Sequence, residues 1–277
     1  MPSGSIQVIM GLSGSGKSTL IRHINRLIDP TAGEVLVNGV DVVKMNQADL
    51  REFRRHQTAM VFQKFALLPH RNILDNTLYG LDVQGIHRSK SIDIAMRWIE
   101  RVGLKGFENK YPNQLSGGMQ QRVGLARALA NDAPVLLMDE AYSALDPLIR
   151  MDMQTVLLDL QKEIKKTVVF ITHDLDEALR LGDQIAILRD GEVVQQGTSQ
   201  DIVLRPADEY IAKFVGEVNR GRVVQVGAVM SPIKPEHEEG PKVSAKCTVD
   251  EAARLLLSDQ HRYLTVIDDE LRPVGVV

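Results

Sequence analysis

The sequence predicts an α/β fold in which a mostly parallel β-sheet carries helices on both faces. Short, wholly apolar runs such as VLLM at 135–138 and VVFI at 168–171 stand between longer segments with helical spacing. Strands that are buried on both faces have this composition, and parallel strands need helical crossovers between them. A glycine-rich segment, GLSGSGKST at 11–19, joins the first apolar run to the first helical segment, which gives the strand, loop and helix order of such sheets.

The two periodicities alternate along the chain. Apolar runs predict strands at Ile6–Met10, Glu34–Val37, Thr58–Phe62, Val135–Met138, Val168–Thr172 and Gln184–Leu188. The last strand turns at 189–191 into a hairpin partner, Glu192–Gln195. Helical spacing predicts helices at Ser18–Leu27, Ala48–Arg55, Ser89–Val102, Gly118–Ala130, Arg150–Lys165 and Leu175–Leu181. This alternation favours one sheet covered on both faces.

Changes in the character of the sequence predict its domain organisation. Strand signals stop between Pro69 and Pro112, so we expect a helical subdomain, at about 69–130, within a sheet domain that covers 1–218. Residues 219–229 are expected to form a linker to a small C-terminal segment, 230–277, whose first part, SPIKPEHEEGPK, is rich in turn formers and charge.

The composition excludes several classes of protein. Among 277 residues, 44% are hydrophobic and 25% are charged, which argues against disorder. The net charge of −3 gives no basis for a nucleic-acid partner. The apolar runs are far shorter than the roughly 18 residues that span a bilayer, and residues 1–5 carry no secretory signal. Cys247 is the only cysteine, so no intrachain disulfide can form and a reducing compartment is expected.

The segment at 11–19 has the spacing G-x-x-x-x-G-K-S, which is typical of a phosphate-binding loop. Glycines allow successive backbone N–H groups to point into one concavity, and the helix N-terminus that follows adds positive charge. Lys17 is expected to reach the β- and γ-phosphates, and Ser18 to ligate Mg²⁺. We therefore expect a nucleoside triphosphate to be held by Gly11, Leu12, Ser13, Gly14, Ser15, Gly16, Lys17, Ser18 and Thr19.

A second predicted strand ends in two carboxylates, Asp139 and Glu140. Ligands bind at this end of the strands in open α/β sheets. Asp139 is expected to support Mg²⁺, and Glu140 to act as a general base toward the attacking water. The alternative is an ordinary acidic junction between strand and loop, which the phosphate-binding loop makes the weaker interpretation.

The segment LSGGM at 115–119 carries a family resemblance. Ser116, Gly117 and Gly118 open a predicted helix, and a simple helix cap would account for Ser116 alone. Together with the phosphate-binding loop and the acidic strand end, however, the segment resembles the signature motif of the ATP-binding-cassette ATPases, with Met119 where glutamine is usual. The resemblance covers about residues 6–218 and implies a P-loop NTPase cassette that binds ATP and Mg²⁺.

The resemblance also implies roles for three further residues. Gln63 is similar to the glutamine that contacts the γ-phosphate and Mg²⁺, and His173 to the switch histidine at the γ-phosphate. Asp146 lies in SALD at 143–146, which is similar to the loop that crosses the interface between two cassettes. The family's mechanism implies that Ser116 and Gly118 of one subunit close over the ATP of the other, in a homodimer or with a paralogous ATPase.

Three classes of function remain at this point: a transporter ATPase, a cassette protein acting on DNA or ribosomes, and a nucleotide-dependent regulator. Only about fifty residues separate Gln63 from Leu115, too few for the long coiled coil of the DNA-repair cassettes. Transport is favoured, with a separate transmembrane permease, an extracytoplasmic substrate-binding protein, and a peripheral place at the cytoplasmic face of the bacterial inner membrane.

Three segments favour a substrate class within the transporters. GLSGSGKSTLIRHINRLIDPTAGEVLVNG, FQKFALLPHRNILDN and MDEAYSALDPLIR closely resemble the ATPase subunits of glycine betaine/proline (quaternary amine) importers. After a capping box at 248–251, the expected helix at 249–258 and strands at 263–267 and 273–277 look like the CBS motif of that subfamily. The alternatives are another amino-acid importer and, for the tail, a generic accessory fold.

Departures from the family lead to further expectations. The adenine-stacking aromatic of an earlier strand is missing, so we expect the cassette to be incomplete at its N-terminus, and Ala141 replaces a usual proline. Residues 230–277 suffice for one CBS-like repeat, and we expect it either to pair with its copy on a second subunit or to be truncated at its end. The following apolar positions are therefore expected to lack a partner within the chain: Ala252, Leu255, Leu256, Leu257, Leu264, Val266 and Val274.

Overall fold

The computed structural model describes residues 1–216, 218–233, 240–258 and 261–277. The chain divides into two compact units, Met1–Val194 and Gln195–Val277, which are considered separately below. This division falls earlier in the chain than the expected domain boundary at 218. Within the described residues, no helix is both long and apolar enough to cross a membrane.

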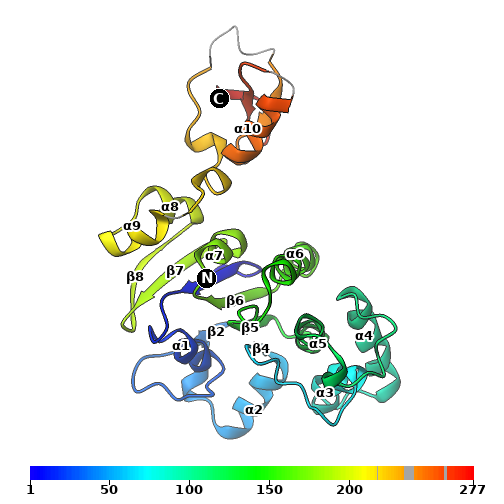
Figure 1. Cartoon of the computed structure of the whole chain (residues 1–277). Helices are drawn as coiled ribbons and strands as arrows, with labels where there is room; N and C mark the ends of the chain where they lie inside the picture. The colour runs from blue at the N-terminus through cyan, green and yellow to red at the C-terminus, as the bar shows by residue number, and fades with distance from the viewer. Residues whose placement is uncertain (217, 234–239, 259–260) are drawn as a thin grey trace. The chain divides into compact units, whose positions relative to one another are not determined.

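A six-stranded sheet forms the centre of the first unit, with the order β4-β5-β6-β1-β7-β8. The first five of these strands are parallel, so their carboxyl ends meet at one edge. The sheet confirms the predicted fold class (Figure 1). The strand bounds are β1 Ile6–Met10, β4 Thr58–Phe62, β5 Val135–Asp139, β6 Thr167–Thr172, β7 Gln184–Arg189 and β8 Glu192–Gly197.

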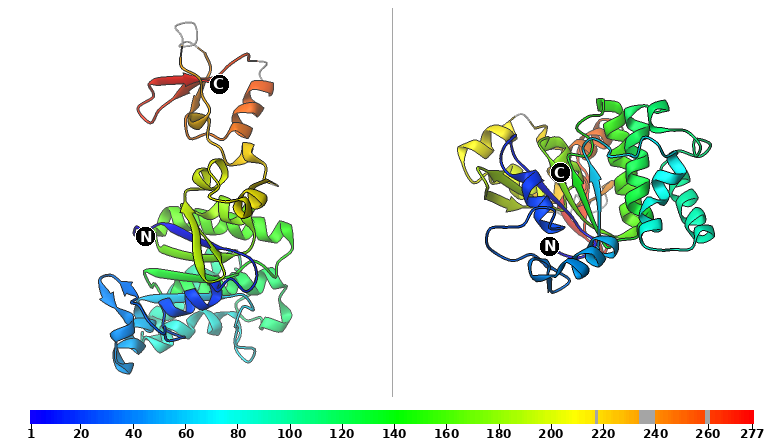
Figure 2. Two further views of the ribbon diagram at one scale, coloured as in Figure 1. Left: turned by 90° about the vertical axis from the view of Figure 1, so that its left-hand side faces the viewer. Right: turned by 90° about the horizontal axis from the view of Figure 1, so that it is seen from below.

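Helices cover both faces of this sheet (Figures 1 and 2). Ile21 of α1 (Lys17–Ile24) packs with Ile9 of β1. The preceding residue of β1, Val8, lies close to Gly182, which directly follows α7 (Leu175–Leu181): a Cβ on this glycine would lie 2.9 Å from the Val8 side chain. Successive residues of a strand point to opposite faces, so α1 and α7 lie on opposite sides of the sheet. The other long helices are α2 Gln47–His56, α3 Ile73–Val83, α4 Arg88–Arg101, α5 Gly117–Ala130 and α6 Pro147–Ile164.

Helices α3, α4 and α5 occupy the range in which the sequence indicated a helical subdomain, and they pack on one another. The residue-by-residue prediction missed α3, because polar residues break up the helical spacing of ILDNTLYGLDV. One of these, Asn76, is fully buried and its amide donates to the backbone oxygens of Leu68 and Arg71 at 3.1 and 2.9 Å. A buried polar residue that hydrogen-bonds to the loop before α3 therefore occupies a position where helical periodicity predicts an apolar residue.

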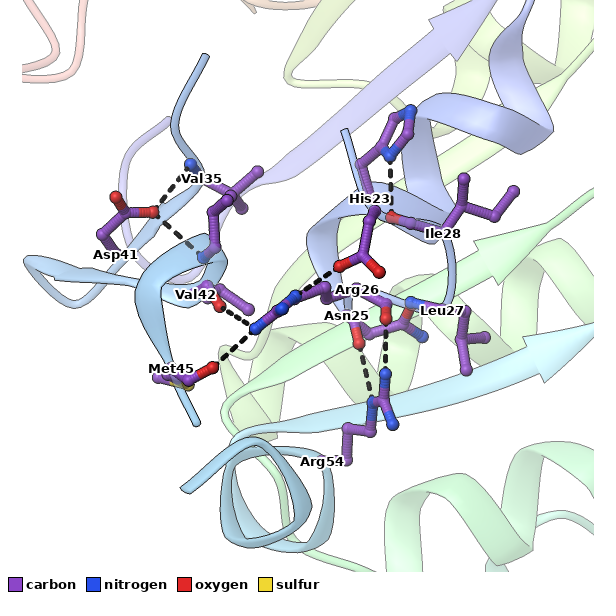
Figure 3. A network of polar contacts seen from close by, with 12 residues as sticks. His23, Asn25, Arg26, Leu27, Ile28, Val35, Asp41, Val42, Met45 and Arg54 are labelled. Carbon is purple, nitrogen blue, oxygen red and sulfur yellow. Dashed lines mark hydrogen bonds and ion pairs between the residues drawn. The ribbon is translucent and has the colours of Figure 1, made fainter. Parts of the chain in front are cut away.

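The end of α1 and the strand after it also differ from the prediction. Helix α1 stops at Ile24 rather than Leu27, because Arg26 has a left-handed backbone (φ 50°). Figure 3 shows two guanidinium groups fixing this turn: Arg54 donates to the carbonyls of Asn25 and Arg26, and Arg26 donates to that of Met45. The following strand is only Leu36–Val37 (β2), and it pairs antiparallel with β3 (Val40–Asp41) outside the main sheet.

The second unit begins with helices α8 (Ser199–Leu204) and α9 (Glu209–Gly216). A three-stranded sheet with the order β11-β10-β9 follows. One helix lies in the sequence between its first two strands. These elements are β9 Lys242–Ser244, α10 Val249–Ser258, β10 Thr265–Ile267 and β11 Pro273–Val276. The expected helix and both expected strands are present, while the assignment to a CBS motif stays a prediction.

The expectation that the whole apolar tail lacks partners is wrong for four positions. Ala252, Leu264 and Val266 are buried in a core of their own with Val226 and Val243. Val226 comes from the stretch expected to be a linker, 219–229, which also contains two short 3₁₀ helices, Arg220–Arg222 and Val226–Ala228. Leu256 packs on this core, and Leu255, Leu257 and Val274 are exposed. Residues 234–239 of the turn-rich stretch lie outside the described residues.

Candidate functional site

The phosphate-binding loop begins where β1 ends. Gly14 and Gly16 have left-handed backbones (φ 85° and 94°). A Cβ placed on Gly14 would have no atom of the described residues within 4 Å, so the space above this glycine is open. Gly16 is the N-cap of α1 and provides no side chain to the first N–H groups of the helix. These N–H groups are therefore available to an anion.

A cavity of about 320 Å³ opens over this loop. Its lining joins the loop to residues from two other strand ends. The lining residues are Ser13, Gly14, Gly16, Lys17, Ser18, Thr19, Gln63 and Glu140. The remaining loop residues, Gly11, Leu12 and Ser15, do not line the cavity. Gly11 packs tightly against the end of β7, since a Cβ at this position would lie 2.3 Å from the carbonyl oxygen of Leu188. The Ser15 hydroxyl is buried without a hydrogen-bond partner among the described residues, which leaves it a free donor within the loop.

Lys17 is the cation of the cavity. It is buried, with 4% of its surface exposed, and its Nζ donates to the carbonyl oxygens of Gly11 and Leu12, both at 2.8 Å. Burial holds the pKa of Lys17 below its ordinary value. The negative charges of Glu140 and Asp139 oppose this effect but do not outweigh it. A partly desolvated ammonium held by two neutral carbonyls gains strongly from an incoming polyanion.

Asp139 and Ser18 form the oxygen-rich side of the site. The Ser18 hydroxyl donates to Asp139 Oδ1 at 2.8 Å, and Arg22 Nη2 donates to Asp139 Oδ2 at 3.2 Å. Asp139 has 6% of its side chain exposed. The sequence interpretation missed Arg22, although its position four residues after Ser18 places both on one face of α1. A hydroxyl and a carboxylate in contact are hard oxygen donors that fit Mg²⁺.

Glu140 lies at the centre of three side chains. Gln63 Nε2 donates to Glu140 Oε2 at 3.1 Å, and His173 Nδ1 lies 3.7 Å from the same oxygen. Ser143 donates its hydroxyl to the carbonyl of Glu140 at 2.9 Å and accepts from Gln63 Nε2 at 3.2 Å. Glu140 itself has a left-handed backbone (φ 45°), an uncommon conformation for a non-glycine residue. Ser143 was not among the predicted site residues, although it opens the SALD segment.

The register of the sheet explains why these residues meet. Phe62 of β4 pairs with Asp139 of β5, Asp139 with Ile171 of β6, and Thr172 of β6 with Met10 of β1. Gln63, Glu140, His173 and Gly11 each come directly after the last residue of their strand. Four strand ends in register therefore deliver one residue each to the same edge.

Four predicted residues lie elsewhere, at the starts of α5 and α6. The Ser116 hydroxyl caps α5 by accepting from the backbone N–H of Met119 at 3.3 Å, and the Asp146 carboxylate caps α6 by accepting from that of Ile149 at 3.1 Å. The two helix starts pack closely, because a Cβ at Gly118 would lie 2.5 Å from Ile149 Cγ2. Neither Ser116, Gly117, Gly118 nor Asp146 lines the cavity of its own chain.

Comparison with known proteins identifies the family. The family described as ABC transporter matches residues 1–143, which hold the phosphate-binding loop, the signature segment and both carboxylates. The chain belongs to the ABC transporter family. Its central sheet and helical subdomain are those of an ABC cassette, as the sequence predicted, and ABC cassettes bind ATP.

Individual relatives lie among transport ATP-binding proteins. The chain is 56% identical over 87% of its length to the glycine betaine transport ATP-binding protein OpuAA of Bacillus subtilis, covering 58% of that protein. It is 49% identical over 99% of its length to the glycine betaine/proline betaine transport system ATP-binding protein ProV of Salmonella typhimurium, covering 68% of it. It thus spans less than two thirds of OpuAA.

A solved ABC cassette confirms the fold. The dimeric structure of the cassette MJ0796, in a post-hydrolysis state bound to ADP and Pi, superposes with a TM-score of 0.66 and 37% sequence identity. The match covers 72% of this chain and 87% of the MJ0796 chain.

Proposed function

We propose that this chain is the ATP-hydrolysing subunit of a bacterial importer for glycine betaine, proline or a related quaternary amine. The observation that carries the proposal is the convergence of Lys17, Glu140 and Gln63 on one cavity at the carboxyl edge of the sheet. A triphosphate cradle and a carboxylate within one cavity are what phosphoryl transfer to water requires.

In this proposal the residues divide the work of hydrolysis. Lys17 and the loop N–H groups hold the β- and γ-phosphates. Glu140 takes a proton from the attacking water, and the oxygen of that water bonds to the γ-phosphorus. The bond from the γ-phosphorus to the β–γ bridging oxygen breaks, which gives ADP and phosphate. His173 and Gln63 orient the reacting groups from either side of Glu140.

Ser18, Asp139 and Gln63 are the proposed residues around Mg²⁺. The contact between the Ser18 hydroxyl and Asp139, at 2.8 Å, supports this assignment, since both offer oxygen ligands. When bound, the ion neutralises charge that develops on the phosphate oxygens. One carboxylate and one hydroxyl leave room for phosphate and water ligands, which Mg²⁺ retains in sites of this kind.

We further propose that two copies, or this chain and a paralogous ATPase, complete each other's sites. Ser116, Gly117, Gly118 and Asp146 lie outside the cavity of their own chain, and α5 presents a helix N-terminus. An N-terminus of this kind suits a partner's γ-phosphate. The dimeric state of MJ0796 supports the same arrangement.

Ser116→Arg tests this sharing of sites. We expect the variant to bind ATP with wild-type affinity, since its own cavity is intact, but to lose most hydrolysis, because a bulky cation meets the partner's triphosphate. Calorimetry and phosphate release measure the two effects, with Ser89→Arg on the exposed start of α4 as the matched control. Mixing with Lys17→Ala protein should restore at most one working site per dimer. Full activity of Ser116→Arg alone would overturn the shared site.

The permease is proposed to dock in a groove between the sheet and the helical subdomain. This groove, of about 410 Å³, is mostly apolar and has Tyr79 and Val83 of α3 exposed at its side. A partner helix with an apolar face would fit it. Attachment at this groove would make the chain a peripheral protein of the cytoplasmic face of the inner membrane, with the substrate-binding protein acting from the other side through the permease.

An uptake measurement tests the transport function and its substrate. The chain is produced together with the permease and binding protein of the transport system to which OpuAA or ProV belongs, in bacteria that lack their own betaine uptake. We expect accumulation of labelled glycine betaine that unlabelled proline betaine competes away and that Glu140→Gln abolishes. The chain is also 43% identical over 77% of its length to the methionine import ATP-binding protein MetN of Staphylococcus saprophyticus. Uptake of methionine instead, with the corresponding permease alone, would assign the chain to another amino-acid importer.

A further inference from the structure

Arg150, in the first turns of α6, connects two loops of the candidate site. Its Nη1 donates to Asp174 Oδ2 at 3.1 Å, and its Nη2 donates to the carbonyl oxygen of Leu145 at 3.2 Å. Asp174 is the residue after His173, and Leu145 ends the stretch that begins at Glu140. One side chain therefore holds together the loop that carries His173 and the loop that carries Glu140.

Both loops are held firmly at the points that Arg150 reaches. Asp174 Oδ1 caps α7 by accepting from the N–H of Glu177 at 3.1 Å, and the N–H of Asp174 donates to Thr172 Oγ1 at 3.0 Å. His173 stands between these two anchored residues. On the other loop, Leu145 N–H donates to the carbonyl of Tyr142 at 3.2 Å. A shift of Arg150 would therefore move the backbone on either side of the contact between His173 and Glu140.

Side chains other than Arg150 also join α6 to α7. Arg180 of α7 donates to Gln154 Oε1 at 2.7 Å and to Thr155 Oγ1 at 2.8 Å, and Gln154 donates to the buried Glu177 at 3.1 Å. Both side-chain acceptors of Arg180 belong to α6 itself, whereas the Glu177 side chain is also hydrogen-bonded to Thr172 at the end of β6. Arg150 differs in that both of its acceptors are loop groups, and its third donor, Nε, is buried without an acceptor among the described residues.

We propose that Arg150 is a positioning residue for ATP hydrolysis, which sets His173 against Glu140 by bridging Asp174 and Leu145. This inference rests on the proposed function. It predicts that loss of the bridge lowers the rate of the chemical step and leaves ATP binding unchanged, because the acceptors of Arg150, Asp174 and Leu145, lie outside the phosphate-binding loop.

The test uses a double-mutant cycle with Arg150→Met and Asp174→Asn. Asparagine keeps an oxygen that can cap α7, but it replaces the oxygen that accepts from Arg150 by an amide NH2, which cannot accept a hydrogen bond. We expect each single variant to lower kcat by roughly tenfold or more with an unchanged dissociation constant for ATP, as the loss of a charged hydrogen bond predicts. The double variant should be no slower than the worse single variant, since both remove the same bridge. Arg150→Lys should recover part of the rate, because its ammonium can still reach Asp174.

Arg180→Met is the matched control. It removes an arginine between the same two helices, so it should lower the unfolding temperature at least as much as Arg150→Met while kcat stays within about twofold of the wild type. Equal loss of kcat in Arg180→Met, additive effects in the cycle, or wild-type kcat in folded Arg150→Met would each overturn the positioning role. Absence of ATP hydrolysis in the wild-type protein would instead contradict the proposed function itself.

Discussion

Glu140→Gln is expected to lower kcat for ATP hydrolysis by about 10²–10⁴-fold, the usual contribution of a general base. The amide cannot take the proton of the attacking water. It can still accept the hydrogen bond from Gln63 Nε2 that the carboxylate accepts at 3.1 Å, so the geometry of the strand end is kept. ATP binding should persist, because the phosphates are held by Lys17 and the loop.

Single-turnover phosphate release and equilibrium nucleotide binding separate these two effects. Glu163→Gln, on the exposed side of α6, makes the same chemical change outside the site and should leave both quantities unchanged. Wild-type turnover in Glu140→Gln would remove Glu140 from the mechanism. Loss of ATP binding with an intact fold would give it a binding role in place of a catalytic one.

Lys17→Ala is expected to fail at the earlier step of nucleotide binding. The ammonium is buried beside the cavity, and within the part of the chain that the structure describes no other lysine lines it. Truncating one partner of a buried, hydrogen-bonded charge pair costs about 2–5 kcal/mol, which corresponds to a loss of roughly 30-fold or more in affinity. Isothermal calorimetry with ATP measures this loss directly.

The carbonyl oxygens of Gly11 and Leu12 also lose their donor in Lys17→Ala, so the fold of the variant needs a separate check by circular dichroism. Lys162→Ala, at an exposed position of α6, is the matched control and should bind ATP normally. Unchanged ATP affinity in Lys17→Ala would show that the loop at 11–19 does not hold the triphosphate.

The candidate site was largely predictable because its parts follow strands with clear sequence signals. The apolar runs that end at Met10, Phe62 and Thr172 have in the structure the end points predicted for them. Each is followed at once by a residue of the candidate site, and parallel strands bring their ends together. The contacts of Ser143 were missed because they depend on the conformation of the turn after Glu140. The contact of Arg22 was missed because it depends on which face of α1 lies toward Asp139.

The parts that failed to follow from the sequence depend on contacts between distant segments. Helix α1 ends early where Arg54, which lies 29 residues after Asn25, donates to the carbonyl oxygens of Asn25 and Arg26. Ala252 and Val266 are buried together with Val226, which comes from an earlier stretch of loop-like composition. Periodicity within a segment carries no information on either contact.

The most direct test of the account is the composition of the complex that Glu140→Gln forms with ATP and Mg²⁺. Analytical ultracentrifugation gives the number of chains, and bound nucleotide is counted in the same fraction. We predict a dimer that holds two ATP molecules, one between each phosphate-binding loop and the Ser116 of the other chain, and a monomer when Ser116→Arg is added. A monomer that binds ATP fully on its own, or a dimer that persists with Ser116→Arg, would contradict the shared site.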